Sequence, residues 1–161
     1  MNKHLSRKQP YGTVVCTVLL ALALMPLAVE AADPIVLNQH DISSWKAVEG
    51  VQPLSPTQTA KEAVLWGDPK TGEHGVLNEW GRNVRSGWQT RASDARIVVV
   101  RGTFAITVEG QRARELDAGG FVLIPQGVKS NFGCAAMGRC TFVLYQNGPA
   151  GPQAAPPPPT R

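Results

Sequence analysis

The chain has 161 residues, of which 43% are hydrophobic and 17% charged, and its formal net charge is +4. Without Lys3, Arg7, Lys8 and Glu30, 13 basic and 11 acidic residues remain, a net charge of +2. No run of Lys and Arg is longer than an isolated pair, so the charge pattern predicts no nucleic-acid partner. After its N-terminal segment the chain is one domain long.

Residues 1–31 have the pattern of a secretory signal peptide. Basic residues precede an uncharged apolar run, TVVCTVLLALALMPLA (13–28), which ends shortly before VEA (29–31). This pattern predicts cleavage between Ala31 and Ala32 and a mature protein in the periplasm or outside the cell. The run is short for a stable membrane span, although an uncleaved anchor is the alternative.

Residues 32–60 are predicted to form an N-terminal arm, which contributes a strand and a turn that pack against the main body. Over 61–148 the chain consists of short β-branched or aromatic runs, each ended by Gly, Asp, Asn or Pro. The runs are EAVLWGD, GVLNEWG, RIVVVRGTFAITVEG, FVLIPQG and CTFVLYQNG. Since no helix-period segment follows the signal, the pattern predicts an all-β sandwich or small barrel.

The last residues, 149–161, are rich in proline, with four in succession at 156–159. Proline cannot donate a ladder hydrogen bond, so we expect a disordered, extended and solvated tail. A Pro-rich recognition segment is the alternative.

Cys134 and Cys140 bracket a short loop that contains Gly138. In an oxidising compartment this arrangement predicts a local disulfide that closes a hairpin. The alternative is a redox-active pair, but such motifs usually separate the cysteines by two residues at the start of a helix. We therefore expect a structural disulfide.

Two segments, GWQTRASDARIVVVRG (87–102) and GGFVLIPQGVKSNF (119–132), resemble the two motifs of the cupin superfamily of small β-barrels. The backbone-defining residues of those motifs are kept at Gly102, Gly120, Pro125 and Gly127. SSWKAVEG, AVLWGDPKTGEHGV and the C-x5-C pair extend the resemblance to secreted single-domain cupins. It implies a jelly-roll β-barrel with an N-terminal arm, and the possibility of a homodimer, since cupins commonly pair through their N-terminal strands.

Cupin motifs commonly supply three histidines and one glutamate to a divalent transition metal. Counted from Gly102 in the first motif and from Pro125 and Gly127 in the second, the four ligand positions are occupied in this chain by Gln89, Arg91, Ala95 and Ser130. After the signal only His40, in the arm, and His74 remain. His74 cannot share an inner strand face with its neighbour Glu73. We therefore expect no metal and no other cofactor.

If the former ligand positions point inward, period-two alternation places Gln89, Arg91 and Ser130 in the barrel, with Phe132 on the same face as Ser130. These four are the candidate ligand-binding residues; no catalytic residue is identifiable. Arg91 requires an internal carboxylate, for which Asp94 and Glu79 are candidates, or an incoming anion. The alternative is that its guanidinium reaches water at the barrel mouth.

The alternation also predicts that Ile97 and Val99 face inward, that Arg96, Val98 and Val100 face outward, and that Trp88 packs outside the barrel. Three functions remain open. The first is a non-catalytic module that binds a small polar or anionic molecule. The second is a cupin enzyme of dioxygenase, isomerase or decarboxylase type with non-standard ligands. The third is a structural, dimerising protein whose barrel is plugged. A remaining pocket around an unpaired Arg91 would favour the first.

Overall fold

The computed structural model describes residues 34–51 and 58–159, and the chain divides into two units, Met1–Pro34 and Ile35–Arg161. The signal segment predicted over 1–31 lies outside the described residues. The second unit contains all the strands of the described part of the chain. Among its described residues no helix has the length and apolar character needed to cross a membrane.

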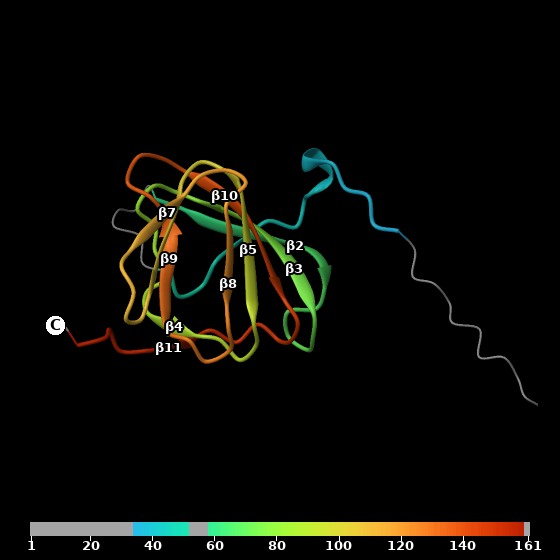
Figure 1. The fold of residues 1–161 in the computed structure, drawn as a ribbon. Coiled ribbons are helices and arrows are strands. Elements are labelled where there is room, and N and C mark those ends of the chain that lie inside the picture. The colour runs from blue at the N-terminus through green and yellow to red at the C-terminus, as the bar shows by residue number, and fades with distance from the viewer. Residues whose placement is uncertain (1–33, 52–57, 160–161) are drawn as a thin grey trace, which may run out of the picture. The chain divides into compact units, whose positions relative to one another are not determined.

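Two antiparallel sheets form the fold (Figure 1). The six-stranded sheet has the order β1 (Lys46–Ala47), β2 (Ala60–Gly67), β3 (His74–Trp80), β10 (Cys140–Gln146), β5 (Ala95–Arg101) and β8 (Phe121–Ile124). The five-stranded sheet has the order β11 (Gln153–Ala154), β4 (Gln89–Thr90), β9 (Ser130–Cys134), β6 (Phe104–Val108) and β7 (Arg114–Leu116). A single 3-10 turn, η1 (Gln39–Asp41), is the helical element of the described part. The predicted all-β jelly-roll is confirmed.

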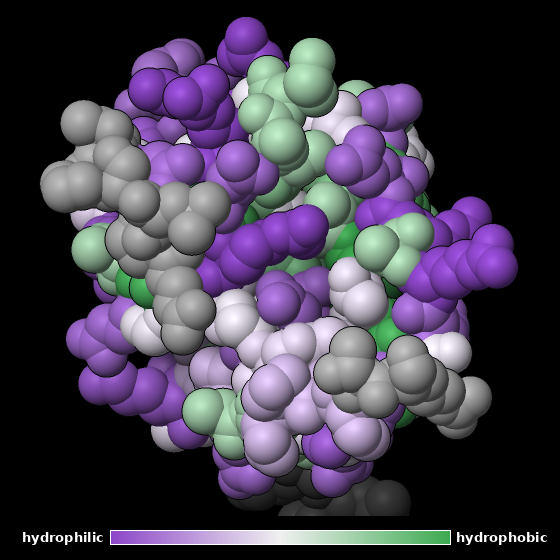
Figure 2. All heavy atoms as spheres, turned by 90° about the vertical axis from the view of Figure 1, so that its left-hand side faces the viewer, coloured by the Kyte–Doolittle hydropathy of each residue, from purple (hydrophilic) through white to green (hydrophobic). Residues whose placement is uncertain are grey.

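Side-chain alternation along the strands separates the core from the surface. In β5, Ile97 and Val99 are buried, whereas Val98 and Val100 are 44% and 52% exposed, as the alternation predicts. On the side where β7, β9 and β4 lie, hydrophilic side chains dominate the surface (Figure 2). The apolar side chains of both sheets therefore meet in the interior.

The centre of the core is aromatic. Phe104 packs against Phe142 and Phe132 with ring centroids 5.0 and 5.7 Å apart, and Trp80 lies 5.3 Å from Phe142. These rings come from β3, β6, β9 and β10, so they join the two sheets. Such contacts add specific geometry to the burial of large apolar surfaces.

The arm supplies the expected strand, because β1 pairs with β2 through Lys46 and Glu62. The tail prediction is corrected for 153–155. Gln153 and Ala154 form β11 on the edge of β4, and the Ala155 amide donates to the Trp88 carbonyl at 2.8 Å. The physical reason is that the prolines flank this stretch, so three successive backbone N–H groups remain available for pairing.

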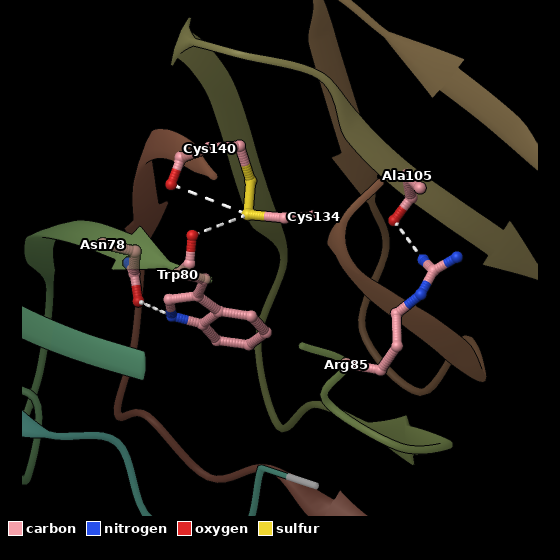
Figure 3. The surroundings of a disulfide bond; sticks show 6 residues. All are labelled: Asn78, Trp80, Arg85, Ala105, Cys134 and Cys140. Atoms are coloured by element: carbon pink, nitrogen blue, oxygen red, sulfur yellow. Dashed lines mark hydrogen bonds between the residues drawn. A yellow bond between two sulfur atoms is a disulfide. The ribbon is translucent and has the colours of Figure 1, made fainter. Parts of the chain in front are cut away.

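Cys134 and Cys140 form the predicted disulfide between the end of β9 and the start of β10 (Figure 3). The sulfur of Cys134 lies 3.2 Å from the carbonyl oxygen of Trp80. A disulfide sulfur carries no proton, so this is a close contact and not a donated hydrogen bond. The indole of Trp80 donates instead to Asn78 Oδ1 at 3.2 Å. The disulfide therefore borders the aromatic core.

Two of the motif glycines hold turns that a side chain would disturb. Gly102, between β5 and β6, has a φ of 75°, and Gly127, after β8, also has a φ of 75°. The Gly127 amide donates to the Arg91 carbonyl at 3.0 Å, and the Gln126 amide donates to Asp94 Oδ1 at 2.9 Å. The turn of the second motif thus binds the loop of the first and positions Arg91.

Gly102→Ala should destabilise the protein more than Gly110→Ala. Both glycines have a positive φ, which costs an alanine about 1 kcal/mol or slightly more. A Cβ at Gly102 would collide with the carbonyl oxygen of Arg139, whereas one at Gly110 has nothing within 4 Å. We expect an additional loss of about 2 kcal/mol for Gly102→Ala, measured by urea unfolding. Equal losses would contradict the steric role assigned to this turn.

Candidate functional site

A cavity of about 820 Å³ lies on the inner faces of β3, β4, β9 and β10. Gln89, Arg91 and Phe132 all line it. Segments of the arm (46–51) and residues of the tail, among them Ala154 of β11, also contribute to its wall. The barrel is therefore hollow at the place where the two motifs put the former ligand positions.

The guanidinium of Arg91 is the most unusual feature of the cavity. Its side chain is half-buried, and Nη1 donates to Gln146 Oε1 at 2.9 Å. Its Cζ lies 5.3 Å from the ring centroid of Phe132. Nε is buried and has no hydrogen-bond partner among the described residues. A buried donor without an acceptor costs free energy, so the unpartnered Nε–H destabilises the folded state.

Asp94 and Glu79, the two candidate internal carboxylates for Arg91, are engaged elsewhere. Asp94 accepts the Gln126 amide, and Glu79 pairs with Lys61 at 2.7 Å. Both are taken by groups closer in the sheet or turn. The acceptor that Arg91 does find is the neutral amide of Gln146.

Burial of the Arg91 side chain disfavours its positively charged form. Burial lowers the pKa of Arg91 to about 10, and the negative charge of Glu62 opposes this shift. Glu62 itself lies 3.5 Å from Lys46 on the neighbouring strand. At neutral pH the guanidinium is therefore charged, half-buried and without a carboxylate in direct contact among the described residues.

Gln146 was not found from the sequence. It is fully buried at the end of β10, where its Nε2 donates to Ser93 Oγ at 3.0 Å while its Oε1 accepts from Arg91. Its cross-strand partners are His74 on one side and Ala95 on the other. The signal was present in CTFVLYQ, because Cys140, Phe142 and Leu144 alternate inward and Gln146 continues that face.

His74 enters the cavity wall while Glu73 does not, as the opposite faces of a strand require. Its Nδ1 lies 2.9 Å from the Gly72 carbonyl oxygen, which can only accept, so Nδ1 carries the proton. Glu73 instead accepts a hydrogen bond from the Tyr145 hydroxyl. This hydrogen bond raises the pKa of Tyr145, and desolvation adds to the shift.

The other candidate positions differ in what they present to the cavity. Gln89 is buried, lines the cavity, and pairs in register with Ser130. Ser130 is also buried but does not line the cavity, and its Oγ has no partner among the described residues. Phe132 forms part of the wall beneath Arg91. Ala95 is fully buried in the core.

Trp88 corrects a further prediction, since it lines the cavity and is half-buried. The alternation that would turn it outward starts only at Gln89, where β4 begins. Gly87 before it has a φ of 70°, so the preceding backbone is not extended. Trp88 therefore follows turn geometry.

The donor set of the cavity does not fit the divalent metal that the fold family implies. No group of three His, Cys, Asp or Glu side chains converges in the part of the chain that the structure describes. The former ligand positions present an amide, a guanidinium, a methyl and a hydroxyl group. A fixed positive charge at Arg91 is also unfavourable for a neighbouring cation.

A family model described as "Domain of unknown function (DUF4437)" matches residues 18–149. No curated protein matches the chain. A cupin-like protein from Thermotoga maritima is 21% identical, with 62% of this chain and 79% of that chain covered and a TM-score of 0.55.

Two further solved structures are similar. A cupin 2 conserved barrel domain protein from Rhodopseudomonas palustris is 19% identical, with 68% of this chain and 75% of that chain covered and a TM-score of 0.55. The polyketide cyclase RemF from Streptomyces resistomycificus is 18% identical, with 70% and 78% covered and a TM-score of 0.56. At these identities the likeness shows the fold alone.

Arg91→Met should stabilise the protein in the absence of a ligand. Methionine keeps the apolar stem over Phe132 but removes a half-buried charge, so we expect a gain of about 1 kcal/mol at pH 7 by urea unfolding. The folded pKa lies below the usual value, so the unfolded state binds more protons above about pH 10. The wild type should therefore recover stability relative to the variant as the pH rises through 10.

The matched control is Arg96→Met, since Arg96 lies on the outside with its Cζ 5.4 Å from the Tyr145 ring centroid. We expect this change to alter stability by less than about 0.5 kcal/mol. A loss of stability in Arg91→Met larger than in Arg96→Met would mean that Arg91 is a structural residue.

Proposed function

The chain belongs to the DUF4437 family and has the cupin fold, and on that premise we propose that it is a non-catalytic cupin that binds a small anionic molecule in its barrel. The observation that carries the proposal is Arg91, a cation without a carboxylate partner among the described residues that lines a cavity of about 820 Å³. A guanidinium offers paired donors that match carboxylate and phosphate oxygens. An anion would supply the missing negative charge.

The cavity supports binding over a plugged, purely structural barrel. Its volume lies within the range of small-molecule sites, about 300–1,000 Å³. Residues from both sheets converge on it, so the ligand would be held by rigid strands. Two of the former ligand positions, Gln89 and Arg91, serve as recognition groups in this proposal, with Phe132 also in the wall and Ser130 paired with Gln89 on the neighbouring strand.

We also propose that the mature protein works in the periplasm or outside the cell. The disulfide between Cys134 and Cys140 supports this, since disulfides persist in oxidising compartments and are rare in the cytosol. The signal-like sequence of residues 1–31 supports the same destination.

The proposal predicts anion-dependent thermal stabilisation. Acetate, inorganic phosphate and D-glucuronate would each be titrated into the purified mature protein, and at least one should raise Tm with increasing concentration because it binds the folded state. Arg91→Met should abolish the shift, while Arg96→Met should retain it. The proposal fails if none of the three anions raises Tm, or if Arg91→Met responds like the wild type.

A further inference from the structure

Building on the proposed anion site, we infer that its ligand is a monoanionic, polyhydroxylated carboxylate of the size of a sugar acid. Three features of the cavity carry this inference: the guanidinium of Arg91, the balance of charges along the wall, and the neutral polar and aromatic groups around them.

The guanidinium of Arg91 keeps one donor for a carboxylate. Nη1 is held by Gln146 Oε1, whereas Nη2 has no hydrogen bond to the described residues and is not enclosed by them. Nε is enclosed by protein atoms, so it lies out of the reach of a ligand. A charge-assisted hydrogen bond from Nη2 to a carboxylate oxygen is stronger than one between neutral groups. The Gln146 bond, itself braced by Ser93 Oγ, fixes the orientation of the guanidinium.

The charge balance of the wall favours a single negative charge. The charged lining residues are Lys46, Glu49, Glu62, Lys70 and Arg91, which sum to +1. Glu62 interacts electrostatically with Arg91 and pairs with Lys46. A monoanion would therefore neutralise the cavity, whereas a dianionic phosphate ester would add a second charge near Glu62 with no further cation to balance it.

The rest of the wall suits hydroxyl groups on a compact ring. Gln89 brings a neutral amide to the inner face, and it is 7% exposed. Buried amides cost free energy unless they are hydrogen-bonded, and hydroxyl groups can donate to and accept from them. The half-buried Trp88 adds an apolar surface that can pack against the C–H face of a sugar ring.

Isothermal titration with four probes separates these features. D-Glucuronate carries the carboxylate and hydroxyls, D-glucose lacks the charge, D-glucose 6-phosphate carries two charges, and cyclohexanecarboxylate lacks the hydroxyls. We expect D-glucuronate to bind at least about tenfold more tightly than each of the other three, a difference of about one lost charged or polar interaction. Arg91→Met should abolish the binding of D-glucuronate.

Glu62→Gln tests the charge balance directly. Removing one negative charge should reduce the preference for D-glucuronate over D-glucose 6-phosphate by about fivefold, because the dianion gains more than the monoanion. Glu49→Gln is the matched control: Glu49 also lines the cavity but is exposed to solvent, so it should change the preference by less than about twofold.

The outcomes distinguish this inference from the proposed function. If D-glucose 6-phosphate or cyclohexanecarboxylate binds as tightly as D-glucuronate and Arg91→Met abolishes that binding, the anion site stands and the sugar-acid inference is overturned. If no probe binds, or if binding survives Arg91→Met, both are overturned. An unchanged preference in Glu62→Gln would refute the charge-balance argument.

Discussion

The site depends on one guanidinium that its own protein does not neutralise. Arg91 is half-buried, donates one hydrogen bond to the neutral amide of Gln146, and leaves Nε without an acceptor among the described residues. Desolvating a charge in this way opposes folding, and the pKa of Arg91 falls to about 10 as a result. A residue that costs stability at the wall of a hollow barrel is most simply explained by a ligand that compensates it.

The scaffold around Arg91 keeps the backbone of a cupin and changes its chemistry. Gly102 and Gly127 hold tight turns with positive φ, and the Gly127 amide binds the Arg91 carbonyl. The side chains at the former ligand positions are different, so the same backbone geometry now presents a cation where the superfamily commonly holds one. In the proposed function, this fixed positive charge is the group to which an anion binds.

The fold was largely predictable because strand alternation and turn glycines are local signals. Ile97, Val99 and Phe132 lie where period two places them, and Cys134 and Cys140 are bonded. The partners of Arg91 were not predictable in the same way. Gln146 reaches it from β10, 55 residues away, and that contact depends on strand order and register, which single-sequence patterns do not specify. The position of Trp88 was not predicted correctly because Trp88 lies in a turn, where the alternation of a strand does not apply.

The pairing of the tail was also not predictable from sequence patterns alone. Its prolines predict a disordered, solvated segment, but three residues between them find an unpaired edge at β4, and that edge exists only in the assembled sheet. Ala154, in this paired stretch, contributes to the cavity wall together with the arm. Both ends of the described chain therefore help to shape the site, although neither carries a motif.

The central claim is that an anion binds beside the guanidinium of Arg91. NMR of the side-chain Nε–H groups in ¹⁵N-labelled protein, with the Arg91 signal assigned by its loss in Arg91→Met, tests this directly. Titration with D-glucuronate should shift that signal saturably, because the anion changes the electrostatic field at the guanidinium, while the Arg96 signal stays in place. An Arg91 signal that does not respond to the anion would contradict the account.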